Sequence, residues 1–135
     1  LQDWDLDESV LVKRPFGVQN NSCSWPMAML MEHLILTGVA IRKTIGLLST
    51  GTRPQHLPHI ADGKPSGGRG PRIRGEFDRF LNKFVECSDG LTFRPRPTLP
   101  HPWTGEMSAL HWFKFAALHQ CMHPIQVART MERMT

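Results

Sequence analysis

The longest apolar run of the chain spans residues 19–49 and constrains the fold more than any other segment. Pro26 lies near its start, and no further proline follows within the run. Proline is tolerated in the first turn of a helix, because the N–H that it lacks would have no partner there. Apolar residues then recur at spacings of three, four and seven. The pattern predicts one long helix over residues 24–48, with Ser24 as its N-cap.

This helix is apolar on most of its sides, which is typical of a helix buried in a protein core or in lipid. Glu32 and His33 interrupt the apolar run, and Arg42 and Lys43 close it. The uninterrupted pieces are shorter than the roughly 20 residues that a membrane-spanning helix needs. We therefore predict a buried core helix and no transmembrane span.

Two glycines, Gly38 and Gly46, lie inside the predicted helix. A glycine in a helix interior costs about 1 kcal/mol relative to alanine. We expect each of them either to weaken the helix or to let a neighbouring helix approach closely.

Three further helices are predicted C-terminal to the first. Residues 75–87 carry phenylalanine, leucine and valine at positions i, i+3, i+4, i+7 and i+8, with polar residues on the other side. A second helix is expected over 105–122, with Thr104 as its N-cap. Pro124 should end it and start another over 125–134. The fold class predicted is mainly α, with about four helices and little strand.

Long irregular segments separate these helices within one small domain of 135 residues. Residues 1–9 form an acidic arm with four acids and no base, residues 50–74 a basic loop rich in glycine, proline and arginine, and residues 94–103 a proline-rich strap. We expect the arm to be solvated or to dock on a basic surface with Trp4 as its anchor. Three widely spaced cysteines do not form a disulfide framework, which favours an intracellular or organellar setting.

The basic loop is the main candidate for binding an anionic partner, because the positive charge of the chain is concentrated there. The formal net charge is +4 and the isoelectric point is about 9.4. Arginine suits bidentate contact with phosphate or carboxylate. No aromatic residue is interleaved with the arginines, so recognition of bases by stacking is not expected. RNA, anionic lipid head groups and an acidic protein remain alternatives. The candidate binding residues are Arg53, Lys64, Arg69, Arg72 and Arg74.

A second candidate site is Cys23, which follows an Asn/Ser-rich segment and precedes the long helix. A helix N-terminus favours a thiolate and lowers its pKa. The segment resembles the nucleophile box of papain-like cysteine peptidases. That resemblance implies Cys23 as nucleophile and Gln19 or Asn21 as oxyanion donor. A histidine elsewhere in the chain would then act as base, with His111 the first choice and His101 and His119 the alternatives.

His119 and His123 are spaced so that they share one helix face, as metal-binding pairs do. No other pair of cysteine, histidine or aspartate residues stands at matching ligand spacing to complete a site. We therefore predict no metal and no cofactor, and name His119 and His123 as weak metal candidates.

The function favoured by these features is that of a non-catalytic, basic accessory subunit of a larger assembly. The assembly would be a ribonucleoprotein or an organellar membrane complex, with the mitochondrial matrix side as the expected location. The subunit would bind other protein subunits through its arm, loop and strap, and RNA or lipid head groups through its basic loop. The alternatives are a cysteine peptidase or related thiol enzyme that uses Cys23, and a stand-alone nucleic-acid-binding module that uses residues 53–74.

Overall fold

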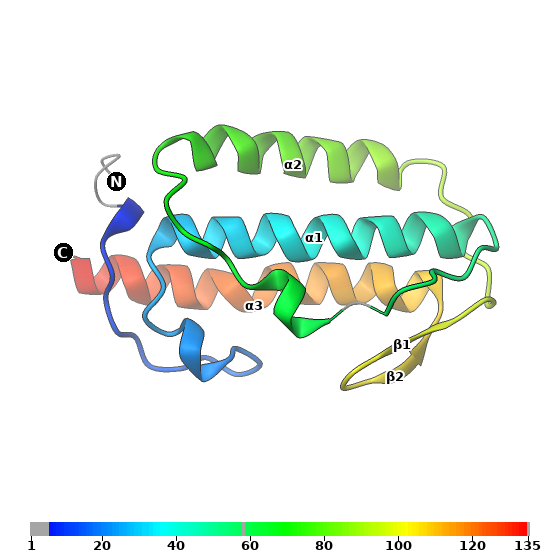
Figure 1. The fold of residues 1–135 in the computed structure, drawn as a ribbon, viewed down its shortest axis with the longest axis horizontal. Helices are drawn as coiled ribbons and strands as arrows, with labels where there is room; N and C mark the ends of the chain where they lie inside the picture. Colours follow the sequence, from blue (N-terminus) through cyan, green and yellow to red (C-terminus); the bar gives the residue numbers. More distant parts are fainter. Residues whose placement is uncertain (1–5, 58, 135) are drawn as a thin grey trace.

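The computed structural model describes residues 6–57 and 59–134, which form three long helices and one small hairpin (Figure 1). The helices are α1 (Met27–Ser49), α2 (Arg72–Ser88) and α3 (Ala109–Met134). The strands are β1 (Leu99–His101) and β2 (Gly105–Met107), and two short 3-10 helices are η2 (Asn20–Ser22) and η3 (Ile60–Gly63).

Helix α1 lies between α2 and α3 and packs against both (Figure 1). The chain colours in Figure 1 show that α1 and α2 run in the same direction and that α3 runs opposite to them. The connection from α1 to α2 therefore returns along the length of α1, and η3 within it contacts this helix. The central position of α1 explains why its sequence is apolar on most sides.

Two apolar clusters hold the helices together. One cluster joins the C-terminal half of α1, the N-terminal half of α3 and the hairpin, and Trp112 at its centre donates its indole N–H to the carbonyl oxygen of Leu99 at 3.3 Å. The other cluster joins the start of α1 to Leu6 and to the start of α2. Its members are Leu6, Met27, Ala28, Leu30 and Ile73.

The mainly helical fold is confirmed, but the predicted break at Pro124 is wrong, because this residue lies inside α3. Proline in a helix interior costs about 3 kcal/mol through a lost hydrogen bond and a steric clash. Here His123, Gln126 and Thr130 are buried on either side of Pro124. Their packing holds both halves in one line, so three helices stand where about four were expected.

The start of α1 also differs from the prediction. The N-cap position belongs to Pro26, and no side chain caps the helix there. Residues Asn20–Ser22 form η2, and Ser24 accepts a hydrogen bond from the hydroxyl of Ser9 through its backbone oxygen. Ser24 is therefore part of the turn that leads into the helix and does not cap it.

Residues 105–107 form strand β2 and not the first turn of a helix. Strand β1 pairs with β2 in antiparallel register, with Leu99 opposite Met107. Helix α3 begins only after Ser108, whose backbone oxygen accepts the N–H of Trp112 at 3.0 Å. The second half of the proline-rich strap, residues 94–103, is thus one strand of a hairpin that covers Trp112.

None of the helices in the described parts of the chain is both long enough and apolar enough to cross a membrane. This agrees with the expectation of no transmembrane span.

Candidate functional site

A cavity of about 130 Å³ opens between α1, α3, the hairpin and the loop that follows α1. Five of the seven histidines of the chain line it, which marks the cavity as the candidate site. Aromatic rings form much of the remaining wall. The histidines are His33, His59, His101, His119 and His123, and the aromatic residues are Trp25, Trp103, Trp112 and Phe115.

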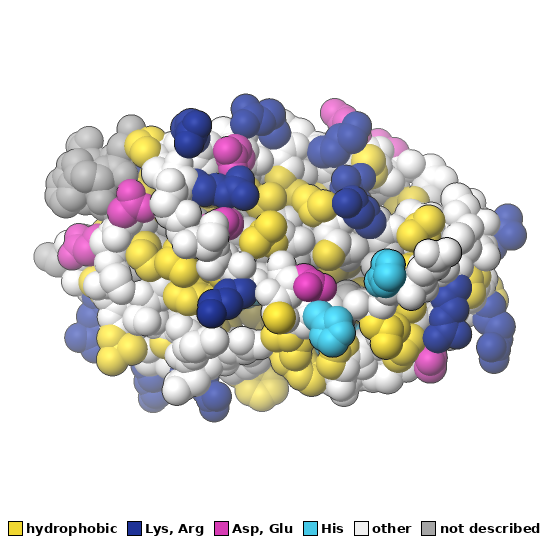
Figure 2. Space-filling model, viewed as in Figure 1, with side chains coloured by type: hydrophobic (Ala, Val, Ile, Leu, Met, Phe, Trp, Pro, Cys, Tyr) yellow, Lys and Arg dark blue, Asp and Glu magenta, His cyan; other side chains and the backbone are white. Residues whose placement is uncertain are grey.

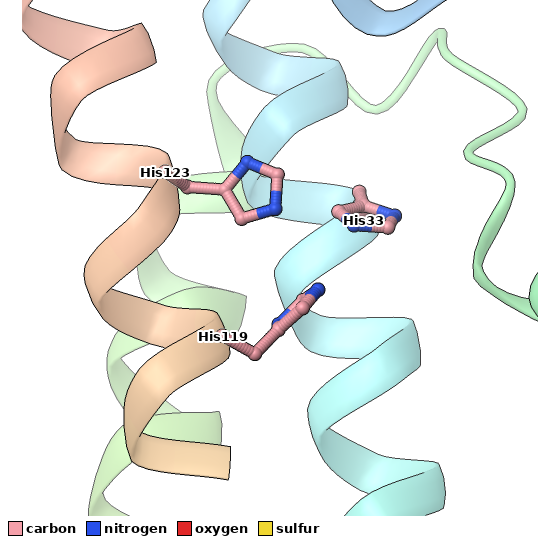
Figure 3. Close-up of side chains that lie close together, drawn as sticks. All are labelled: His33, His119 and His123. Atoms are coloured by element: carbon pink, nitrogen blue, oxygen red, sulfur yellow. The ribbon is translucent and has the colours of Figure 1, made fainter. Parts of the chain in front are cut away.

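Three of these imidazoles converge on one point of the cavity wall (Figure 3). His119 and His123 project from successive turns of α3, and His33 faces them from α1. The ring centroids lie 5.0 Å apart for His33–His123 and for His119–His123, and 5.3 Å apart for His33–His119. One ring nitrogen from each residue lies within 4.8 Å of the other two. This set is called the histidine cluster below.

The tautomer of His33 is fixed by its surroundings. Its Nδ1 lies 2.6 Å from the backbone oxygen of Gly63, the last residue of η3. A carbonyl oxygen only accepts hydrogen bonds, so Nδ1 carries the hydrogen and donates it. In the neutral ring the other nitrogen, Nε2, is then unprotonated and has a free lone pair.

The tautomer of His123 is fixed in the same way through Gln126, which is fully buried. The Gln126 side-chain amide donates to the backbone oxygen of Ser22 at 2.5 Å, which orients the amide. Its oxygen then faces His123 Nδ1 at 3.1 Å and accepts that hydrogen. His123 therefore also keeps a bare Nε2.

His119 has no such partner. Its Nδ1 is buried and makes no hydrogen bond within the described structure. Burial, together with the neighbouring His123, His33 and His101, lowers the pKa of His119 to about 3. Burial also lowers the pKa of His33 and of His123 below the ordinary value. All three rings are thus neutral at pH 7, which is the form that binds metal ions.

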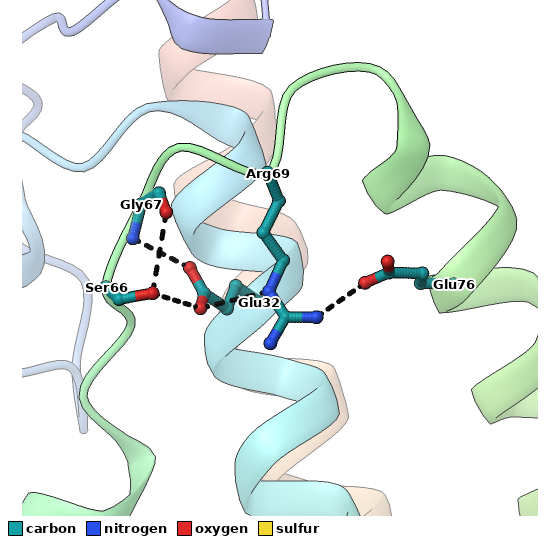
Figure 4. A network of polar contacts seen from close by, with 5 residues as sticks. All are labelled: Glu32, Ser66, Gly67, Arg69 and Glu76. Atoms are coloured by element: carbon teal, nitrogen blue, oxygen red, sulfur yellow. Dashed lines mark hydrogen bonds and ion pairs between the residues drawn. The ribbon is translucent and has the colours of Figure 1, made fainter.

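A network around Glu32 holds the loop that carries Gly63 (Figure 4). Glu32 precedes His33 in α1 and is 2% exposed. Its carboxylate accepts hydrogen bonds from the hydroxyl of Ser66 and the backbone N–H of Gly67, both at 2.9 Å. Burial raises the pKa of Glu32. The hydrogen bonds from Gly67, Ser66 and Arg69 together lower it by more than burial raises it, so the pKa lies below the ordinary value.

Arg69 extends this network to α2. Its guanidinium contacts Glu32 at 3.2 Å and Glu76 at 2.6 Å (Figure 4). A segment rich in glycine and proline buries too little apolar surface to order itself. The buried carboxylate of Glu32 supplies the missing attachment, and it thereby helps to hold the Gly63 carbonyl against His33.

The donor set of the histidine cluster fits a first-row transition metal ion such as zinc. Imidazole suits zinc, copper, iron and nickel. Two ligands of a tetrahedral zinc ion with bonds of about 2.0–2.1 Å lie about 3.3 Å apart. The three nitrogens lie within 4.8 Å of one another, so the set has to draw closer together to reach that spacing around an ion. Hydrogen bonds to the second ring nitrogen, as His33 and His123 make them, are typical of metal-binding histidines.

Cys23 does not line this cavity, although Ser22 and Trp25 near it do. The thiol is 4% exposed and contacts the backbone oxygen of Gln19 at 3.7 Å. His111 is exposed on α3 and pairs with Ser108. Among the described residues no imidazole forms a hydrogen bond with Cys23, so the nucleophile and base that the resemblance implies are not brought together.

The basic residues of the loop fall into two groups. Arg69 is engaged with Glu32 and Glu76, whereas Arg53, Lys64 and Arg72 are exposed. Arg74 is half-buried in the first turn of α2. On the face shown in Figure 2, Lys and Arg side chains lie mainly around the edges and apolar side chains in the middle. Anion binding by the exposed group stays a prediction.

Sequence reasoning found two members of the histidine cluster and missed His33. Helical spacing reveals His119 and His123 because they lie on one helix, whereas only the tertiary packing of α1 on α3 brings in His33. One signal was present: Glu32 and His33 are adjacent polar residues in an otherwise apolar helix, and buried polar groups need partners. Both have them, in Ser66 and Gly63.

Comparisons of this chain with protein-family models, with curated proteins and with solved structures found no significant match. The geometry of the cavity is therefore the basis for assigning a function.

Proposed function

We propose that this chain binds a divalent first-row transition metal ion, of the zinc type, through His33, His119 and His123. The observation that carries the proposal is the convergence of three neutral imidazoles from two helices, two of which have their Nδ1 hydrogens already engaged. The hydrogen bonds to Gly63 and Gln126 leave Nε2 of His33 and of His123 bare. A largely enclosed cluster of this kind is costly for a protein without a ligand, because buried polar atoms such as His119 Nδ1 remain unpaired.

Three histidines would leave an open coordination position. Closed structural zinc sites use four protein ligands, whereas catalytic sites use three and keep one position for water or substrate. The cluster lies in the wall of a cavity and not in a sealed core. We therefore propose a metal site with one exchangeable ligand position, and not a structural metal site.

The proposal is tested by titrating the metal-free protein with Co²⁺ and Zn²⁺, followed by the visible absorption of Co²⁺ and by calorimetry. We expect one ion per chain, with an absorption intensity typical of four- or five-coordinate cobalt. His33→Ala, His119→Ala and His123→Ala should each weaken binding by about 100-fold or more, since each removes one of three ligands.

His56→Ala and His111→Ala are matched controls, because both residues are exposed and do not line the cavity. They should leave the affinity unchanged. Equal loss in cluster and control variants would show that surface histidines bind the ion and would refute the proposal. Binding of the unaltered protein no tighter than millimolar would refute it as well.

The accessory-subunit function is a second candidate, and exposed apolar side chains on the long helices favour it. Val85 of α2 is 65% exposed, and Leu118 and Ile125 of α3 are 58% and 51% exposed. We propose that these faces meet other subunits, and that Arg53, Lys64 and Arg72 meet RNA or anionic lipid at a mitochondrial or other organellar location. Binding of single-stranded RNA or anionic vesicles that weakens steeply with salt would support the electrostatic part, and salt-independent binding would contradict it.

A further inference from the structure

We infer that the cavity beside the histidine cluster takes a small anion with oxygen donors and an apolar body the size of one ring. This inference rests on the proposed metal site and names the class of ligand that its open position accepts. Three features support it: the charge of the loaded site, the size and lining of the cavity, and the tautomer of His101.

The charge of the loaded site favours an anion. Three neutral histidines leave the two positive charges of a divalent ion uncompensated. Asp62 lines the loop side of the cavity, where its carboxylate accepts the backbone N–H of His59 at 3.0 Å. Asp62 is exposed to solvent, which screens its charge. An anionic oxygen donor therefore completes the coordination better than a neutral group.

The size and lining of the cavity favour an apolar body of one ring. The volume is about 130 Å³, slightly below that of an apolar cavity of about 150 Å³ that holds benzene. Aromatic and aliphatic side chains make up much of the cavity wall. They include Trp25, Leu36, Ile41, Trp112 and Phe115.

His101 adds a hydrogen-bond donor to this wall. Its Nδ1 lies 3.2 Å from the backbone nitrogen of Trp103 and accepts that N–H. The neutral ring must then carry its hydrogen on Nε2, the opposite arrangement to that of His33 and His123. The ring packs against Phe115 with centroids 4.4 Å apart. His101 is thus suited to donate to a ligand oxygen and not to bind the metal.

Trp103 provides a way to test the cavity without disturbing the core. It belongs to the turn between β1 and β2, lines the cavity and is 59% exposed. Its ring lies at the mouth, against His101, with centroids 5.6 Å apart. Removing it should reduce contact with the apolar body of the ligand and leave the three metal ligands in place.

The experiment uses the full chain loaded with Co²⁺ and two probes that share one head group, acetohydroxamate and benzohydroxamate. Binding is followed by the change in cobalt absorption, and cobalt retention is checked by ultrafiltration. Zinc-type ions accept a fifth ligand, so a hydroxamate can bind without displacing a histidine. We expect benzohydroxamate to bind at least tenfold more tightly than acetohydroxamate.

Trp103→Ala should reduce this preference to about threefold or less and leave Co²⁺ affinity unchanged, whereas Val85→Ala, outside the cavity, should change neither. His101→Phe keeps a ring at that position and should weaken the binding of both probes equally.

If Co²⁺ does not bind, the proposed metal site itself is refuted. If Co²⁺ binds but both probes bind with equal affinity, or Trp103→Ala leaves the preference intact, the metal site stands and the inference about the cavity is refuted.

Discussion

The contact between α1 and α3 has two halves that differ in chemistry. In one half, Ile41, Ile45 and Leu48 pack against Ala109, Trp112 and Ala116. In the other half, further along both helices, His33 faces His119 and His123. The same two helices thus present an apolar contact at one end and a set of neutral imidazoles at the other.

This difference indicates that one half stabilises the fold and that the other half is suited to bind a ligand. Apolar burial stabilises by about 25 cal/mol for each Å² removed from water. Buried polar groups contribute only when their hydrogen bonds are complete, and His119 Nδ1 has no partner in the described structure. We therefore expect the apolar half to carry the stability and the histidine half to reduce it in the metal-free protein.

The largest expected effect comes from a pair of substitutions, one in each half, that tests this contrast. Leu48→Ala removes a fully buried side chain and should lower the free energy of unfolding by about 2–5 kcal/mol. His119→Leu removes an unpaired buried nitrogen and should leave the stability of the metal-free protein unchanged or raise it by about 1 kcal/mol. Urea unfolding in the presence of a chelator measures both. A loss for His119→Leu as large as that for Leu48→Ala would remove the distinction.

The two glycines of α1 provide a second test, because only Gly38 is closely approached by α2. A Cβ at Gly38 would lie 2.2 Å from the ring of Phe80, whereas a Cβ at Gly46 meets nothing within 4 Å. Gly38→Ala should therefore destabilise the protein by about 1–3 kcal/mol through overpacking against α2. Gly46→Ala should stabilise it by up to about 1 kcal/mol.

Thermal unfolding of the two glycine variants decides between these expectations. Equal and small changes in the stability of both variants would contradict them, because they would mean that the packing of α2 on α1 does not depend on a glycine at position 38. Phe80→Leu combined with Gly38→Ala serves as a control, since the smaller side chain should recover part of the loss.

The sequence predicted most of the fold because its helices carry strong local signals. The amphipathic pattern of residues 75–87 identified α2, and the long apolar run identified α1. Local rules failed at two places. At Pro124, burial of His123 and Gln126 outweighs the tendency of proline to end a helix. At residues 105–107, pairing of β2 with β1 outweighs the predicted helix start.

The candidate site was less predictable than the fold. The pair on α3 is visible from spacing, but His33 is distant in sequence and His101 lies among prolines. Only packing of α1 and the hairpin on α3 brings them to one cavity. The attachment of the basic loop to α1 and α2 also depends on tertiary packing. Arg69 is predicted to face an anionic partner, but its partners, Glu32 and Glu76, belong to the chain itself.

The smallest expected effect is a pH dependence that belongs to the histidine half alone. The pKa values of His33, His119 and His123 are lowered in the folded chain, to about 3 for His119. The unfolded chain therefore binds protons first, at an ordinary pKa near 6.5. The lowered pKa values therefore cost the folded chain nothing above pH 6.5, and they reduce its stability increasingly as the pH falls below 6.5.

At pH 5.5, His119 alone should cost the metal-free protein about 1 kcal/mol relative to pH 7.5, with smaller costs from the other two rings. Glu32 does not obscure this window, because its lowered pKa gives stability that is lost only as the pH falls below the ordinary carboxyl pKa near 4.5. Urea unfolding at pH 7.5, 6.5 and 5.5 measures the slope, and His119→Leu should reduce it. An equal slope in that variant would show that the imidazoles titrate freely in the folded chain, and the histidine half would then not be the dry, neutral ligand set on which the metal site depends.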